Sequence, residues 1–264
     1  MRGFIILFLI CSLSGFAGKK GKKITIKSVK AYAVGSEDQT PAQVKRKALN
    51  EAKLIALQKA GVTEQITAYS DFLTKEENNE IEEIFNSNIL NDLQGVVTEV
   101  KVISESKNIN DQGLLRVDIE ANITVLKFAY GMDASFDVWI DGVKPSYNEG
   151  DNLTFEIKPN KNSYLRAFII TESNEAFQLF PSEYEGDFKM KEKETYKFPH
   201  ASINYQLTTE KKKDTHRLIL VTLKKDVPYN TDVSYKALMD WVFQITPDER
   251  RITTFSFDLY GSKP

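Results

Sequence analysis

The two histidines, His200 and His216, are the side chains best suited to bind a metal or to transfer protons near neutral pH. They stand on either side of the lysine run at residues 211–213, which is expected to be a solvated loop. Two histidines would need carboxylates to complete a metal site, and the sequence has no HExxH spacing. We therefore expect no catalytic residue, no metal site and no cofactor.

Carboxylates are the other candidates for chemistry. Asp137, Asp141, Glu149 and Asp151 could gather around a calcium ion at one rim, although acids at strand ends and turns are more often solvated. The turn at residues 108–113 resembles part of a calcium loop, but Ile119 stands where the closing acid belongs. The sequence also lacks the GxSxG, P-loop and GxGxxG motifs.

Residues 1–17 have the pattern of a secretory signal peptide: a positive start, an apolar run of about ten residues, and small residues before the expected cleavage after Ala17. The run is too short to span a bilayer, which takes about 20 residues. Cleavage would remove Cys11, the only cysteine, and leave a basic linker at residues 18–23. Two alternatives stay open, an uncleaved anchor and lipidation of Cys11, which Ile10 precedes where a lipoprotein has a small residue.

The charge balance does not favour nucleic acid as a partner. Charged residues make up 27% of the chain and the formal net charge is −2. The lysine runs carry no interleaved aromatic platform for bases, so they are expected to be solvated surface. Membrane association remains open, but not through a spanning helix.

Residues 24–130 are expected to form an α/β sandwich. A strand at residues 24–34 precedes a helix whose start shows a capping box, with Thr40 as the cap, Pro41 in the first turn and Gln43 three residues on. Gly61 suits its C-terminal end. A second helix is predicted at residues 75–90, and alternating residues at 96–103 and 115–125 predict a long antiparallel hairpin with one face buried.

Residues 133–264 are expected to form an antiparallel β-sandwich with a C-terminal helix and strand, so the predicted fold class is α+β. Strands are predicted at residues 136–140, 153–157, 164–171, 175–180, 203–208 and 216–223, with a turn at residues 173–174. Two groups of residues serve as a fold signature. They are the turn residues Tyr147, Gly150 and Asp151, and the strand end Leu179, Phe180 and Pro181.

The predicted C-terminal helix covers residues 233–245, with Thr231 or Asp232 as its cap and Pro247 as its end. Leu238, Trp241, Val242 and Ile245 share one helical face, which is expected to pack on the sandwich. In the alternative, an exposed Trp241 face binds a partner. Residues 252–260 alternate as a final strand.

The N-terminal half resembles the N-terminal domain of flagellar assembly protein T and related small envelope lipoproteins. The resemblance rests on the first strand, the alanine-rich helix VKRKALNEAKLIALQKAG, the Gln-Gly-Val-Val segment at residues 94–97 and the long hairpin. Those relatives often carry a lipidation motif, which this chain lacks. The flagellar role is not carried over.

The C-terminal half resembles the bacterial domain-of-unknown-function family numbered 4384. VWIDG, YNEGD, SYLRAFIIT, FQLFP and LILVTLKKDVP carry this resemblance in consistent order, over residues 135–228. Members of that family are extracytoplasmic or intracellular modules, some joined to peptidase or kinase domains. The resemblance implies a binding or assembly module and transfers no catalytic residue.

Together these patterns predict an exported, non-enzymatic binding or assembly accessory of the bacterial cell envelope, periplasmic or secreted and with envelope proteins as partners. Association with the outer membrane is an open part of that expectation. Two rival classes remain. A carboxylate-dependent hydrolase of carbohydrate or peptide would show two buried acids about 5–10 Å apart in a groove. A ligand-sensing module would show an apolar pocket with a few convergent polar groups.

Overall fold

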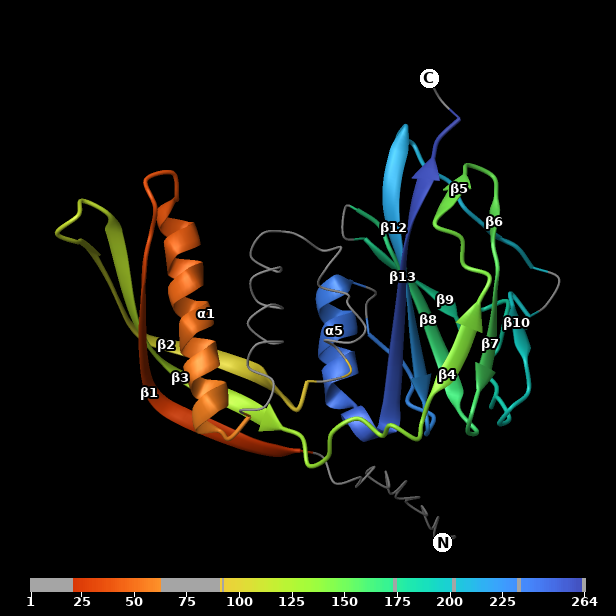
Figure 1. Cartoon of the computed structure of the whole chain (residues 1–264), viewed down its shortest axis with the longest axis horizontal. Coiled ribbons are helices and arrows are strands. Elements are labelled where there is room, and N and C mark those ends of the chain that lie inside the picture. Colours follow the sequence, from red (N-terminus) through yellow and green to blue (C-terminus); the bar gives the residue numbers. More distant parts are fainter. Residues whose placement is uncertain are drawn as a thin grey trace, which may run out of the picture.

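The computed structural model describes residues 21–62, 91, 93–172, 175–200, 203–231 and 234–262 (Figure 1). It is mainly β, with 48% strand and 15% helix, in several sheets. The signal peptide at residues 1–17, the second helix at residues 75–90 and the turn at residues 173–174 lie outside the described residues.

The N-terminal unit consists of a helix on a three-stranded antiparallel sheet (Figure 1). The sheet has the order β1-β3-β2, so the hairpin partner β3 is its central strand. Strand β1 begins inside the expected basic linker, which is therefore shorter than predicted. The elements are β1 (Lys22–Val34), α1 (Pro41–Lys59), β2 (Gly95–Ile109) and β3 (Leu115–Lys127).

Helix α1 begins and ends as its sequence predicts. Thr40 accepts a hydrogen bond from the backbone N–H of Gln43, and the Gln43 side chain accepts from the backbone of Thr40 at 2.7 Å. Gly61 follows the helix with a φ of +77°, which glycine adopts without strain. The buried face carries Ala48 and Ala52, whose small side chains let the helix approach the sheet closely.

The predicted hairpin forms, but only part of it has a buried face. Alternate residues of β3 from Val117 to Val125 are buried beneath α1. In β2 the burial ends near Val100, and Val102, Ile103 and Ile109 are exposed. Figure 1 shows why, since the far end of the hairpin bends away from α1. The expectation of a buried face along the whole hairpin was therefore wrong for the outer half of β2.

The C-terminal unit contains a five-stranded sheet of order β5-β13-β12-β8-β9, with β10-β7-β4 and the short pair β11-β6 facing it. Within the large sheet only the β5–β13 pairing is parallel. Its strands are β5 (Ser146–Asn148), β8 (Tyr164–Ile170), β9 (Ala176–Phe180), β12 (Lys213–Leu223) and β13 (Arg250–Tyr260). The facing strands are β4 (Val138–Asp141), β6 (Asn152–Leu153), β7 (Phe155–Pro159), β10 (Tyr196–Phe198) and β11 (Tyr205–Gln206).

Both faces of the five-stranded sheet are covered. One face meets the smaller sheets through a core that includes Phe155, Leu220 and Phe257. The other face lies under α5 (Tyr235–Gln244), so β12 is buried without interruption from His216 to Leu223. A strand buried on both faces loses the apolar–polar alternation of a surface strand.

Helix α5 departs from its prediction in its cap and in its end, and its apolar face packs on the five-stranded sheet. Its cap is Ser234, whose hydroxyl accepts from the backbone N–H of Ala237, and not Thr231; Asp232 lies outside the described residues. Pro247 opens the short 3-10 helix η1 (Pro247–Glu249) after α5 has ended at Gln244. Trp241 is 7% exposed, packs against Phe168 and donates its indole N–H to the Pro228 carbonyl at 3.0 Å. It is therefore a core residue, and the exposed partner surface considered for it does not exist in this structure.

Candidate functional site

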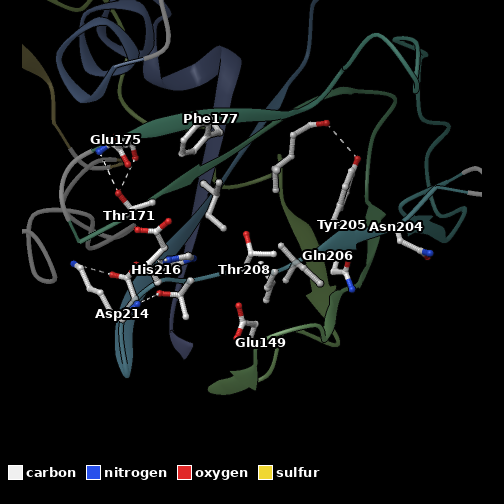
Figure 2. Close-up of a pocket in the computed structure, with 17 residues that line it drawn as sticks. Glu149, Thr171, Glu175, Phe177, Asn204, Tyr205, Gln206, Thr208, Asp214 and His216 are labelled. Atoms are coloured by element: carbon white, nitrogen blue, oxygen red, sulfur yellow. Dashed lines mark hydrogen bonds and ion pairs between the residues drawn. The ribbon is translucent and has the colours of Figure 1, made fainter. Parts of the chain in front are cut away.

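An open pocket of about 780 Å³ lies between one end of the five-stranded sheet and the short β11-β6 pair. Strands β8, β9 and β12 form one wall, and the segment at residues 204–211 forms another (Figure 2). Its apolar lining comes from Leu153, Ile169, Phe177, Leu179 and Leu207. Its volume falls in the range of small-molecule sites, roughly 300–1,000 Å³.

Asp214 and His216 form the polar centre of the β12 wall. They are two residues apart on one strand, so their side chains point to the same face of the sheet. The His216 Nε2 lies 3.1 Å from the Asp214 Oδ2, and both residues are buried. Lys211 donates to Asp214 at 3.4 Å and to Glu172 at 3.0 Å, and its hydrogen bond to Glu172 is the main cause of a raised Lys211 pKa.

The opposite wall is held by a buried carboxylate. The Tyr205 hydroxyl donates to the Glu185 Oε2 at 2.5 Å, and the backbone N–H of His200 donates to the same carboxylate. Burial of the phenol, followed by the Glu185 hydrogen bond, raises the pKa of Tyr205 above its usual range. Backbone hydrogen bonds from Gly150 to Leu207 and from Leu207 to Asp151 fix the rest of this segment.

The three turn residues of the fold signature have structural roles beside the pocket. Tyr147 is buried, and its hydroxyl accepts from the backbone N–H of Lys144 at 2.9 Å. Gly150 has a φ of +92°, and the Asp151 carboxylate accepts from the Asn148 N–H at 2.8 Å. The turn places Glu149 on the pocket rim, where it accepts from the backbone N–H of Ser262 at 3.0 Å.

The strand-end residues of the signature divide between pocket and core. Leu179 lines the pocket, whereas Phe180 is fully buried and packs edge-to-face on Phe188 and Phe198. A cis peptide bond joins Phe180 to Pro181, whose carbonyl accepts from the Gln178 side chain. Neither group of signature residues assembles a reactive centre.

The structure separates the two histidines by environment. The lysine run at residues 211–213 is exposed, as expected, but its last residue already begins β12, and His216 on that strand lines the pocket. His200 is exposed and its ring lies against Phe188. In the described ranges, no three His, Cys, Asp or Glu side chains come together in a way that could hold a metal ion.

The four acids considered as calcium ligands form other contacts or are exposed to solvent. Asp137 pairs with Arg251 at 3.3 Å, and Asp141 is exposed at the end of β4. Glu149 accepts from Ser262 near the C-terminus, and Asp151 accepts from Asn148 within its own turn.

Two residues that shape this pocket were missed from the sequence, Asp214 in its lining and Glu185 behind Tyr205. Asp214 was not singled out because it directly follows a lysine run, and Glu185 stands in an irregular segment. The sequence did hold a signal for Asp214. It stands two residues before His216 and just before an apolar run, so a strand there places both side chains on one face.

Fold and pocket together define a mainly β protein with an open, mixed polar and apolar pocket at a sheet end. Much of that pocket belongs to a segment with a known family pattern: residues 146–225 match the family described as Domain of unknown function (DUF4384). The match confirms the resemblance of the C-terminal half, although it begins after the VWIDG segment. No curated protein matches the chain. Among the described residues, no helix has both the length and the apolar character needed to cross a membrane.

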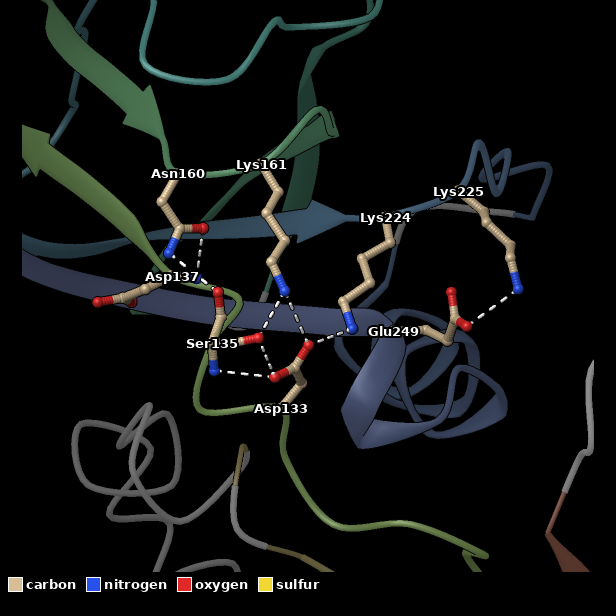
Figure 3. Close-up of polar contacts among 8 residues, drawn as sticks. All are labelled: Asp133, Ser135, Asp137, Asn160, Lys161, Lys224, Lys225 and Glu249. Carbon is tan, nitrogen blue, oxygen red and sulfur yellow. Dashed lines mark hydrogen bonds and ion pairs between the residues drawn. The ribbon is translucent and has the colours of Figure 1, made fainter.

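A second polar cluster fastens the connection between the two units (Figure 3). Asp133, which precedes β4, accepts from Lys224 at 2.6 Å and from Lys161 at 3.3 Å. Its other oxygen accepts from the backbone N–H and the hydroxyl of Ser135. The two lysines come from the β7–β8 turn and the end of β12, so one carboxylate ties the connecting segment to two parts of the C-terminal unit.

Asp133 should make stability acid-sensitive. The hydrogen bond from Lys224, then those from Ser135, lower the pKa of its carboxyl group below the usual range. A carboxyl group whose pKa is lower in the folded state stabilises the protein at pH values above its unfolded-state pKa of about 3.9. That stabilisation is lost progressively as the pH falls below this value. We expect the thermal unfolding midpoint of Asp133→Asn to fall less steeply than that of the wild type between about pH 4 and pH 2.

Asp141→Asn is the matched control, because Asp141 is exposed and should leave the wild-type pH profile unchanged. Equal pH slopes for Asp133→Asn and the wild type would contradict the role given to Asp133.

Proposed function

We propose that this protein is a non-enzymatic binding or assembly accessory of the bacterial cell envelope, exported to the periplasm or beyond. The observation that carries the proposal is the open pocket at the end of the five-stranded sheet, with an apolar lining and a polar rim. Its central charged groups already have partners within the protein, as Asp214 has in His216 and Lys211. Such a site favours recognition over turnover.

Two further features support the envelope setting. Residues 1–17 have the pattern of an export signal, and the N-terminal half resembles envelope domains in its order of strand, helix and hairpin. In this proposal the N-terminal unit is an α/β sandwich of that envelope type and the C-terminal unit is the recognition module. Partners are envelope proteins, and nucleic acid is not among them.

The test is crosslinking of the tagged, exported protein in its own envelope, followed by purification and identification of what is bound. We expect a discrete envelope protein that is absent with the tag alone, and that recovers this protein when it is tagged in turn. Failure to recover a reciprocal partner would overturn the assembly role and favour a ligand-sensing module.

A carboxylate-dependent hydrolase is the second candidate, because several carboxylates line one pocket: Glu149, Glu175, Glu210 and Asp214. Hydrolysis of glycan or peptide substrates that disappears in Asp214→Asn would establish it in place of the binding role. The exposed Glu194→Gln is the control, since Glu194 lies outside the pocket.

A further inference from the structure

We propose that the pocket beside β9 binds a basic, partly apolar segment of a partner protein, with a lysine or arginine side chain directed at Asp214 and His216. This inference rests on the proposed binding function and gives the chemistry of the partner. Three properties of the pocket lead to it: its charge, the state of His216 and its apolar wall.

The charge of the lining is acidic. The carboxylates of Glu149, Glu175, Glu210 and Asp214 all line the pocket, against the single cation of Lys211. Lys211 is itself shared with Glu172, which lies outside the lining. In Figure 2, Glu175, Asp214 and Glu149 lie along one side of the pocket and its lower edge, across from Tyr205 and Asn204. A concave surface of one sign attracts and orients a group of the opposite sign.

His216 indicates that the missing partner is a hydrogen-bond donor. The ring is 6% exposed, and its Nε2 contacts the Asp214 carboxylate. In the tautomer whose Nε2–H donates to Asp214, Nδ1 carries no hydrogen and is an acceptor. Among the described residues this Nδ1 has no hydrogen-bond partner. A buried acceptor without a donor costs free energy, so an N–H group entering beside it would be favoured.

The apolar wall explains why a protein segment fits better than a small free cation. Phe177 is 51% exposed on β9, next to Ile169 and Leu179 in the same lining. Such a wall suits the aliphatic stem of lysine or arginine and the apolar side chains that flank it. Exposed amide and hydroxyl groups of Asn204, Gln206 and Thr208 can pair with the main chain of an extended segment.

The test is a titration of the purified protein with the capped peptide Ac-Ala-Lys-Leu-Lys-Ala-NH2, followed through the NMR signals of the two imidazoles. His216 reports on the pocket, and His200 is an internal reference because it does not line it. We expect a saturable shift of the His216 signals only, with affinity that falls as salt is added. The same peptide with glutamate for lysine should not bind.

Variants define the groups responsible. Glu175→Gln with Glu210→Gln removes two exposed rim charges and should weaken binding about three- to tenfold, given the modest strength of exposed ion pairs. Glu192→Gln with Glu194→Gln removes two exposed acids outside the pocket and should leave the affinity unchanged. Equal binding of the glutamate peptide, or an unmoved His216 signal, would overturn the proposal. Spermidine binding as tightly as the peptide would also overturn it, in favour of a free polyamine.

The failure of this inference can be told from the failure of the proposed function. If the wild type captures a reciprocal envelope partner and Glu175→Gln with Glu210→Gln captures it equally, the binding role stands and the pocket is not the contact. If the wild type captures no partner, the binding role itself fails.

Discussion

Replacing Phe168 by alanine should lower the free energy of unfolding by about 3–5 kcal/mol, the usual cost of removing a large buried aromatic side chain. Phe168 is completely buried on the α5 face of β8. Its ring centroid lies 5.0 Å from that of Tyr229 and 5.9 Å from that of Trp241, both edge-to-face. The substitution would leave a cavity where the helix meets the sheet. Urea unfolding followed by tryptophan fluorescence measures the loss.

Phe177→Ala is the matched control, because Phe177 lies on the neighbouring strand and is half exposed. We expect its cost to stay below about 1 kcal/mol, since little apolar surface is returned to water. Similar losses for the two variants would show that α5 does not pack on this face as described.

Removing both carboxylates that face Arg166 should be nearly as damaging. The guanidinium is buried in the middle of β8, and Asp187 binds it through two parallel hydrogen bonds of 3.0 and 2.8 Å. Asp226 adds a third at 2.6 Å. In Asp187→Asn with Asp226→Asn the cation stays buried without a counter-charge. We expect a loss of about 2–4 kcal/mol, at the lower end of the cost of breaking a buried pair because both acids are partly exposed to solvent.

A third substitution separates charge burial from simple disruption. Adding Arg166→Met to the double variant replaces the uncompensated cation with an apolar side chain of similar length. The triple variant should recover most of the lost stability, because replacing a whole buried ion pair with apolar groups is often neutral. If the triple variant is less stable than the double variant, the cost does not come from an unpaired charge. Chemical unfolding of all three proteins decides the point.

The parts of the fold that could be predicted are those that depend on residues close together in the sequence. The capping box at Thr40 and Gln43, the glycine after α1 and the β2–β3 hairpin all depend on contacts of short range. The cap of α5 was placed wrongly because Thr231, Asp232 and Ser234 are all residue types that cap helices, and the sequence alone does not choose among them. The parallel pairing of β5 with β13 joins residues more than a hundred positions apart, which no local pattern records.

The candidate site was harder to predict, for a related reason. Its walls come from strand β12 and a segment with little regular structure, so no single stretch of sequence describes it. Arg166 is likewise of a residue type that is mostly found on surfaces, and only the tertiary fold brings two acids to it. Among the signature residues, Gly150 and Asp151 lie at the turn after β5, whereas Tyr147 belongs to that strand and Phe180 ends β9.

The pairing of β12 with β13 also affects whether the segment matched by the family can fold without the residues that follow it. The segment shared with the known family ends at residue 225, whereas β13 follows at Arg250–Tyr260 and pairs with β12 along its whole length. Helix α5, which seals the other face, also lies beyond that boundary. Transplanting the shared segment alone into another protein would expose the edge and one apolar face of β12, and such edges recruit foreign strands. The shared segment should therefore fold in another protein only if β13 and α5, or elements that replace them, are also present to cover β12.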